Sequence, residues 1–272
     1  MKKYFFLAGL PRSGNTLLCS LLNQNKDIIC SANSPLSDIL FNLDKVNYSP
    51  IFDNFKDYSS LNNLIKNSFA SYYQNFDCKY IIDRGPWGTP TNLNLLKKYL
   101  NQEIKVIVLV RSIVDILASF VRLNPYSMIV DLYTKEVNCG YRFENTYKND
   151  IEVMCEVLMS PTGLIEKELL SLHNLMMEEN KNSFHILEYD DLVSQPEKSI
   201  ESVYEFLEIP LYEKHDFKKI DQFSLNGVQY EDNFVRDLHK LKSKIEPPNY
   251  KITDILPEKM IKKYSDIEFW RK

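Results

Sequence analysis

With 7 glycines and 12 prolines among 272 residues, the chain has no room for a long low-complexity linker. It contains no internal repeat and no apolar run long enough to span a membrane. The apolar run at residues 4–8 is broken by Gly9 and Arg12, and no small-residue cleavage site follows, so we expect no signal peptide. These absences leave one soluble domain over residues 1–272, a length that buries a substantial core.

Cysteine and histidine are also few, with five and four residues. The cysteines are odd in number, widely spaced and without a Cys-x-x-Cys pair, which disfavours a disulfide frame or a zinc site. The histidines show no metal-ligand spacing. We therefore predict no metal site, free thiols and a cytoplasmic location.

Basic residues are not in excess. Lysine and arginine number 33 against 37 aspartates and glutamates, which gives a net charge of −4. This balance argues against a general nucleic-acid binder. Any cations that bind an anionic ligand must therefore be concentrated locally.

Four short apolar runs predict β-strands that alternate with helices. Residues 105–110 form a continuous run rich in β-branched side chains, which is typical of a strand buried on both faces of a parallel sheet. The other predicted strands lie at residues 4–8, 80–82 and 184–188. We predict an α/β fold in which a doubly wound parallel sheet is flanked by helices, with its ligand at the carboxyl ends of the strands.

Two predicted helices have clear start signals. Ser160 followed by Pro161 predicts a helix start, because serine is a good N-cap and proline suits the first helical position. Apolar residues at helical spacing then continue to Met176. A second helix is predicted to begin near Pro196 and to end before Pro210.

The most informative segment is the loop after the first predicted strand, which reads Gly-Leu-Pro-Arg-Ser-Gly-Asn-Thr-Leu-Leu at residues 9–18. A strand that runs through a glycine-bounded loop into a helix presents backbone N–H groups to an anion at the positive end of the helix dipole. The only cation inside this loop is Arg12. We predict that the anion is bound by Pro11, Arg12, Ser13, Gly14, Asn15, Thr16 and Leu17.

The spacing of this loop is that of a nucleotide P-loop, but Asn15 occupies the position of the P-loop lysine. Kinases and NTPases use that lysine to reach the outer phosphates and a serine or threonine to hold magnesium. A kinase-like phosphotransferase is therefore an alternative that Asn15 disfavours, and a different anion suits the loop better.

Residues 10–18 resemble the 5′-phosphosulfate loop of sulfotransferases that use 3′-phosphoadenylyl sulfate (PAPS), closest to the Pro-Arg-Ser-Gly-x-Thr form of tyrosylprotein sulfotransferases and many bacterial relatives. Residues 110–120 are similar to the 3′-phosphate motif of the same family, in which an arginine and a serine stand eight residues apart. The resemblance implies that Arg111 and Ser119 hold the 3′-phosphate. A guanidinium and a hydroxyl can grip one phosphate through bidentate and directional contacts.

Two weaker similarities extend this resemblance. Residues 188–193 are similar to a segment of the family whose tyrosine lies near the nucleotide, which implies the same for Tyr189. Residues 238–245 are similar to the C-terminal loop that folds over the cofactor, so Ser243 and Lys244 are implied as cofactor-binding residues.

The resemblance implies transfer of a sulfuryl group from PAPS to a hydroxyl or an amine, with PAP as the product. Negative charge then grows on the oxygen that bridges sulfur and the 5′-phosphate, so the site needs cations and N–H donors there. Arg12 and the loop amides fit this role without a metal. The family often adds a lysine after the second core strand, where this chain has Arg84, and arginine does not readily give up a proton.

No motif identifies the base that accepts the acceptor's proton. Tyrosylprotein sulfotransferases have a glutamate soon after the first helix, whereas residues 30–36 contain no carboxylate and the next is Asp38. This departure argues against a peptide-tyrosine acceptor. Asp38, Asp83 and His239 are all candidates for the base, and Asp83 could equally form a structural ion pair with Arg84.

Residues 40–75 and 124–158 are aromatic, rich in asparagine and poorly periodic, and we predict that they form walls on the acceptor side. Basic residues do not cluster beyond 242–244, so we expect a neutral or apolar-bodied acceptor. A small hydroxylated molecule, a lipid or a sugar fits better than a sulfated glycan or an acidic peptide. A non-catalytic module that binds PAP or PAPS is the remaining alternative, because the family's glutamate is missing.

Overall fold

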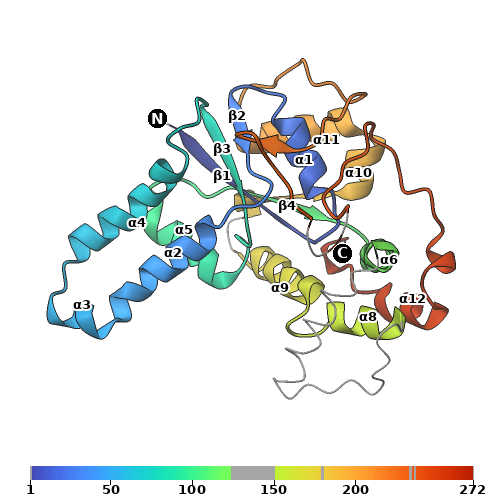
Figure 1. Cartoon of the computed structure of the whole chain (residues 1–272), viewed down its shortest axis with the longest axis horizontal. Helices are drawn as coiled ribbons and strands as arrows, with labels where there is room; N and C mark the ends of the chain where they lie inside the picture. Colours follow the sequence, from blue (N-terminus) through green and yellow to red (C-terminus); the bar gives the residue numbers. More distant parts are fainter. Residues whose placement is uncertain (1, 124–150, 179–180, 233–234, 236, 272) are drawn as a thin grey trace.

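The computed structural model describes residues 2–123, 151–178, 181–232, 235 and 237–271 (Figure 1). Its centre is a five-stranded sheet in the order β2-β3-β1-β4-β5, in which every neighbouring pair is parallel. The strands are β1 (Lys3–Gly9), β2 (Ile28–Cys30), β3 (Tyr80–Arg84), β4 (Val106–Val110) and β5 (Phe184–Glu188). The predicted parallel sheet and its four predicted strands are confirmed, and β2 is an additional short strand.

Helices cover both faces of this sheet (Figure 1). In the described part of the chain they are α1 (Asn15–Leu22), α2 (Leu36–Lys45), α3 (Pro50–Asn54), α4 (Tyr58–Tyr72), α5 (Pro90–Tyr99), α6 (Ile113–Leu123), α8 (Ile151–Leu158), α9 (Leu164–Met176), α10 (Tyr189–Ser194), α11 (Pro196–Leu207) and α12 (Glu258–Tyr264). A small antiparallel hairpin is formed by β6 (Ser224–Leu225) and β7 (Val228–Gln229). None of the described helices is both long and apolar enough to cross a bilayer.

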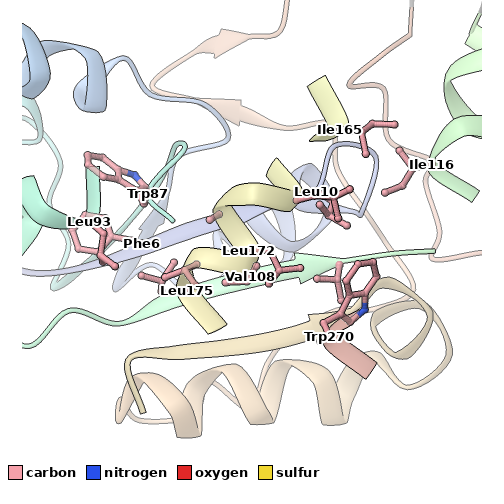
Figure 2. Close-up of a cluster of buried hydrophobic side chains, with 14 of the residues drawn as sticks. Phe6, Leu10, Trp87, Leu93, Val108, Ile116, Ile165, Leu172, Leu175 and Trp270 are labelled. Atoms are coloured by element: carbon pink, nitrogen blue, oxygen red, sulfur yellow. The ribbon is translucent and has the colours of Figure 1, made fainter. Parts of the chain in front are cut away.

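Alternate side chains of the central strands enter two separate cores. In β1, Phe5 and Leu7 pack with α1 and α11, whereas Phe6 and Ala8 point into the larger core on the other face. Every residue of β4 is buried, as expected for a β-branched strand between two layers of helices. Figure 2 shows the larger core, where the Phe6 and Trp87 rings lie 5.0 Å apart between their centroids.

The order of the strands places the two predicted phosphate motifs side by side. The winding of the chain reverses between β1 and β4, which are neighbours in the sheet and carry those motifs at their carboxyl ends. The backbone N–H of Leu10 donates to the carbonyl of Leu109 at 2.8 Å. The topology thus brings together residues that are 100 positions apart in the chain.

One of the two predicted helix starts is confirmed and the other is wrong. Helix α11 begins at Pro196 as predicted. Helix α9 begins at Leu164, with Gly163 as its N-cap, rather than at Ser160. Ser160 instead closes the preceding helix, because its hydroxyl donates to the carbonyl of Val157 at 2.7 Å.

The segment 40–75 is helical rather than irregular. Helices α2, α3 and α4 extend together to one side of the sheet (Figure 1). Helix α4 buries Leu61, Ile65 and Phe69, which repeat every four residues and so lie on one face. Part of the second predicted acceptor wall, residues 124–150, lies outside the described residues.

Candidate functional site

The loop between β1 and α1 has a backbone that glycine makes possible. Gly14 is the N-cap of α1 and has a φ of 89°, in the left-handed region that side chains disfavour. Gly9 lies so close to β4 that an added Cβ would stand 2.7 Å from the carbonyl oxygen of Leu109. The hydroxyl of Ser13 donates to the carbonyl of Leu10 at 2.5 Å. These contacts hold the loop against the end of the sheet.

Asn15 stabilises this loop from inside. Its side chain is buried, and its Nδ2 donates to the carbonyl of Leu10 at 2.9 Å and to the hydroxyl of Ser13 at 3.2 Å. It therefore does not extend outward as a P-loop lysine would. Within this loop, Arg12 rather than residue 15 supplies the cationic side chain.

Arg111 lies at the end of β4 with 5% of its surface exposed. Its Nη1 donates to the carbonyl of Arg12 at 3.1 Å, and its Nη2 lies 3.4 Å from the hydroxyl of Tyr250 and 3.5 Å from Asp115. Its guanidinium also stands 4.3 Å from the ring centre of Tyr189. Arg111 and Tyr189, which come from different predicted motifs, therefore lie in contact.

The nitrogen Nε of Arg111 is buried and has no hydrogen-bond partner among the described residues. A buried guanidinium N–H rarely stays unpaired in a folded protein. This donor is available to an anion in the cavity beside it.

Arg12 directly links the two predicted phosphate motifs. Its backbone has a φ of 61°, and its Nε donates to the hydroxyl of Ser119 on α6 at 3.0 Å. Its Nη1 donates to the carbonyl of Leu238. Burial and the nearby charge of Arg111 lower the pKa of Arg12. The repulsion between two neighbouring guanidiniums favours binding of an anion close to both of them.

These residues surround a cavity of about 380 Å³, which we call the donor cavity. It is lined by Pro11, Arg12 and residues 14–17 of the loop, by Arg84, Arg111 and Tyr189, by part of α6, and by most of a C-terminal segment, residues 238–250. The predicted residue Ser13 is fully buried and does not line it. Seven lysine and arginine side chains line it against one carboxylate, Glu246. This volume lies within the range of about 300–1,000 Å³ that is usual for small-molecule binding sites.

The two residues predicted on the C-terminal segment differ in their placement. Lys244 lines the donor cavity, whereas Ser243 is exposed and is not among the lining residues. The carbonyl of Ser243 accepts a hydrogen bond from the backbone of Ile220 at 2.9 Å. Tyr250, by contrast, contacts Arg111 and was missed, because it belongs to no motif.

Arg84 and Asp83 follow each other in β3 but point to different places. Arg84 lines the donor cavity, and its Nη1 donates to the carbonyl of Ala32 at 2.7 Å. Asp83 is fully buried, where it accepts hydrogen bonds from Trp87 Nε1 at 2.8 Å and from the hydroxyl of Tyr73. Burial raises the pKa of Asp83 to about 6. Its contacts are those of a core residue.

Of the other two candidate bases, one lies at the donor cavity. Asp38 is exposed in the first turn of α2 and lines neither this cavity nor the second one described below. His239 lines the donor cavity, and its Nδ1 is 2.7 Å from Oδ1 of Asp232. Oδ2 of Asp232 accepts from the backbone N–H of His239 at 2.9 Å. Asp232 was missed because no motif includes it.

Burial lowers the pKa of His239, although its contact with Asp232 acts in the opposite direction. Burial alone would raise the pKa of Asp232, but the hydrogen bonds from His239 outweigh it and lower that pKa. A neutral imidazole beside an ionised carboxylate can accept a proton at its other nitrogen. Within the described part of the chain, no group of three metal-ligating side chains is present.

Comparisons with known proteins identify the family and the fold of the chain. A family profile described as "Sulfotransferase domain" matches residues 2–244. The mouse sulfotransferase SULT7A1 complexed with PAP has a TM-score of 0.53 and 13% identity, over 98% of this chain and 82% of its own. The sulfotransferase domain from the Synechococcus PCC 7002 olefin synthase has a TM-score of 0.50 and 17% identity, over 90% of this chain and 85% of its own.

The sulfotransferase domain from the curacin biosynthetic pathway, also at a TM-score of 0.50, is 20% identical over 78% of this chain and 75% of its own. A search of curated protein sequences finds no significant match. At these identities the solved structures establish the shared fold, and the family profile extends over most of the chain.

Proposed function

Because this chain belongs to the sulfotransferase domain family, we propose that it transfers a sulfuryl group from PAPS to a hydroxyl or an amine and releases PAP. The observation that carries the proposal is the convergence of the loop 11–17, Arg111 and Ser119 on one cationic cavity. An arginine with an unpaired, buried Nε supports a site for a polyanionic nucleotide there.

In this proposal Arg111 and Ser119 hold the 3′-phosphate, and the backbone amides of residues 13–17 hold the 5′-phosphate at the start of α1. The hydroxyl of Ser119 accepts from Arg12, so it still has its own proton to donate to a phosphate oxygen. Tyr189 and Tyr250 stand beside Arg111 and offer aromatic surface to the nucleoside.

PAPS, when bound, supplies the sulfuryl group and a phosphate leaving group. Arg12 and Arg84 stabilise the negative charge that develops on the bridging oxygen, which is an electrostatic role suited to arginine. Among the three candidate bases we propose His239, because Asp83 is enclosed in the core and Asp38 lies away from the cavity. We also propose a cytoplasmic location, where reducing conditions keep Cys19 and Cys30 as thiols.

Thermal unfolding with different nucleotides tests the proposal. PAP and PAPS should each raise the melting temperature without magnesium, because the site binds phosphates through arginines and amides. At about 100 times its dissociation constant, a ligand adds about 2.7 kcal/mol of stability. ADP, which lacks the 3′-phosphate, is the matched control and should raise the melting temperature only slightly.

Equal, magnesium-dependent stabilisation by ATP would instead support the kinase-like alternative. Transfer of labelled sulfate from PAPS to a panel of hydroxyl and amine acceptors completes the test. Binding of PAP without transfer to any acceptor would indicate a non-catalytic nucleotide-binding module.

A further inference from the structure

A second cavity, of about 330 Å³, adjoins the donor cavity. His239 and Lys240 line both, so these two residues form the boundary between them. The remaining walls come from the β6–β7 hairpin and the residues on either side of it. An acceptor in this second cavity would therefore meet the donor cavity at the imidazole of His239.

The two cavities carry opposite charge. The donor cavity is strongly cationic, whereas the second cavity has two carboxylates, Asp232 and Asp237, and one cation, Lys240. Lys240 already forms an ion pair with Asp237 at 3.2 Å. A neutral or cationic molecule fits the second cavity, and an anion is repelled.

The polar groups of the second cavity suit a hydroxylated ligand. Gln229 presents an exposed amide there, and Asp232 and Asp237 present carboxylate oxygens. The rings of Phe223 and Tyr230, 5.9 Å apart between their centroids, add flat apolar surface. Carboxylates and amides beside an aromatic face match the alternating polar edge and apolar face of a sugar ring.

His239 is held in one orientation at the boundary. Its ring stacks on Tyr230 with centroids 3.8 Å apart and planes 6° from parallel. Asp232 holds both its Nδ1 and its backbone N–H. The nitrogen Nε2 is left without a protein partner in the described part of the chain, and it is the ring atom available to take a proton.

We propose that the second cavity binds the acceptor, a neutral or cationic sugar-like molecule, and that Asp232 is the positioning residue that keeps Nε2 of His239 on the acceptor hydroxyl. This inference rests on the proposed function. The acceptor hydroxyl gives its proton to Nε2 as its oxygen bonds to sulfur. The bond from sulfur to the bridging oxygen breaks, and its electron pair stays on the phosphate of PAP. The imidazolium then releases the proton to water.

Binding of three matched probes tests the acceptor cavity without turnover. Methyl glucoside, methyl glucosaminide and methyl glucuronide share a ring and differ in charge, and each is titrated by NMR in the presence of saturating PAP. We expect the amino sugar to bind best and the uronide at least tenfold more weakly. Preference for the uronide, or no binding by any of the three, would overturn the assignment.

A pair of substitutions in β7 locates the binding. Gln229→Trp fills the second cavity and should abolish sugar binding without changing the dissociation constant of PAP. Val228→Trp is the control, because Val228 is 69% exposed and does not line the cavity. Equal effects of the two variants would contradict the location. Failure of PAP itself to bind would contradict the proposed function instead.

The role of Asp232 is tested with Asp232→Asn, which keeps the shape of the side chain and removes its charge. We expect kcat to fall about 100-fold, within the usual contribution of general base catalysis, with the affinity for PAP unchanged. Asp232→Glu should recover part of the loss. Asp221→Asn, an exposed aspartate outside both cavities, should leave kcat unchanged.

The pH profile separates positioning from a purely structural effect. The charged and titratable groups that face His239 are Asp232, Tyr230, Arg12, Arg84 and Lys240. Since Asp232 raises the pKa of His239, its replacement by Asn should move the midpoint of kcat/KM to lower pH. The same shift should occur in an NMR titration of the imidazole. An unchanged profile and an unchanged kcat would overturn the role of Asp232.

Discussion

At the scale of single residues, Arg12 and Arg111 are close in space but have different expected roles. Arg111 is almost fully buried at the end of β4, where it holds a fixed position beside Tyr189. Arg12 contacts Ser119 and Leu238 through its side chain, so it connects three segments that border the donor cavity. This difference leads to separate effects on nucleotide binding and on turnover.

Arg111→Ala should weaken PAP binding about tenfold or more, because a charge-assisted hydrogen bond to phosphate contributes about 1.5–3 kcal/mol. Arg12→Ala should lower kcat more than it lowers PAP affinity, because charge on the bridging oxygen grows in the transition state. Isothermal titration and steady-state rates of both variants measure this division. Arg111→Lys is the matched control, since it keeps the charge and loses the planar fork. If the Arg111→Ala variant bound PAP with unchanged affinity, Arg111 would not be a PAP-binding residue.

Asp83 should make the stability of the protein depend on pH. Its pKa is raised by burial from 3.8 to about 6, so the folded state binds this proton more tightly than the unfolded state. The stabilisation is fully present below about pH 4 and is lost as the pH rises through about 6, with a total of about 3 kcal/mol. In the wild type, this contribution makes the free energy of unfolding fall as the pH rises over this range. In the Asp83→Asn variant, that fall should be absent.

Urea unfolding of the wild type and of Asp83→Asn at several pH values measures the difference. The carboxamide keeps the size of the carboxyl group, so the variant preserves packing around Trp87 and Tyr73. Parallel pH curves for the two proteins would show that Asp83 does not titrate in this range.

At the scale of elements, the strand-loop-helix units were predictable because their signals are local. The run before Gly9 and the run 105–110 are buried strands, and the helix after each loop continues the apolar pattern. The start of α9 was not predictable from Ser160 and Pro161, because the hydroxyl of Ser160 bonds to the end of the previous helix instead. The helical spacing of α4 was present in the sequence, at Leu61, Ile65 and Phe69, and was obscured by its many polar and aromatic neighbours.

The contact between Asp232 and His239 could not be read from the sequence. Both residues follow the β6–β7 hairpin, which turns at Asn226 and Gly227 with φ values of 53° and 76°. An Asn-Gly pair is a strong hairpin signal, and it is the one local signal that could have indicated this reversal of the chain. The partner of His239 then depends on packing after the hairpin, for which no periodic pattern exists.

The contact between β1 and β4 predicts a large effect of Gly9→Ala. An added Cβ would lie 2.7–2.8 Å from Leu109 backbone atoms and from Asn15 Oδ1, so the strand pair must move apart. Gly227→Ala is the control, because its Cβ meets nothing within 4 Å and its effect is limited to the positive φ. We expect a loss of about 1–2 kcal/mol for Gly227→Ala and clearly more for Gly9→Ala. The midpoints of urea unfolding compare the two variants. Equal losses of stability would mean that the close approach of Gly9 to β4 tolerates a side chain.

At the scale of the whole molecule, a chain of net charge −4 concentrates seven basic side chains around one cavity. The sheet topology places that cavity at the reversal between β1 and β4, so the fold itself determines the position of the proposed anion site. Residues 40–75 line neither cavity, and the proposed acceptor site lies instead beside the small hairpin. Composition alone indicated that basic residues must be local, and the structure locates them.

The bond from Arg12 to the carbonyl of Leu238 joins the nucleotide loop to the residue just before His239. If this bond holds the C-terminal segment over the bound nucleotide, release of the nucleotide requires that segment to move, and His239 moves with it. We therefore expect a compulsory order of events, with PAPS arriving first and PAP departing last. PAP should inhibit competitively against PAPS and noncompetitively against the acceptor, and a random-order pattern would contradict this.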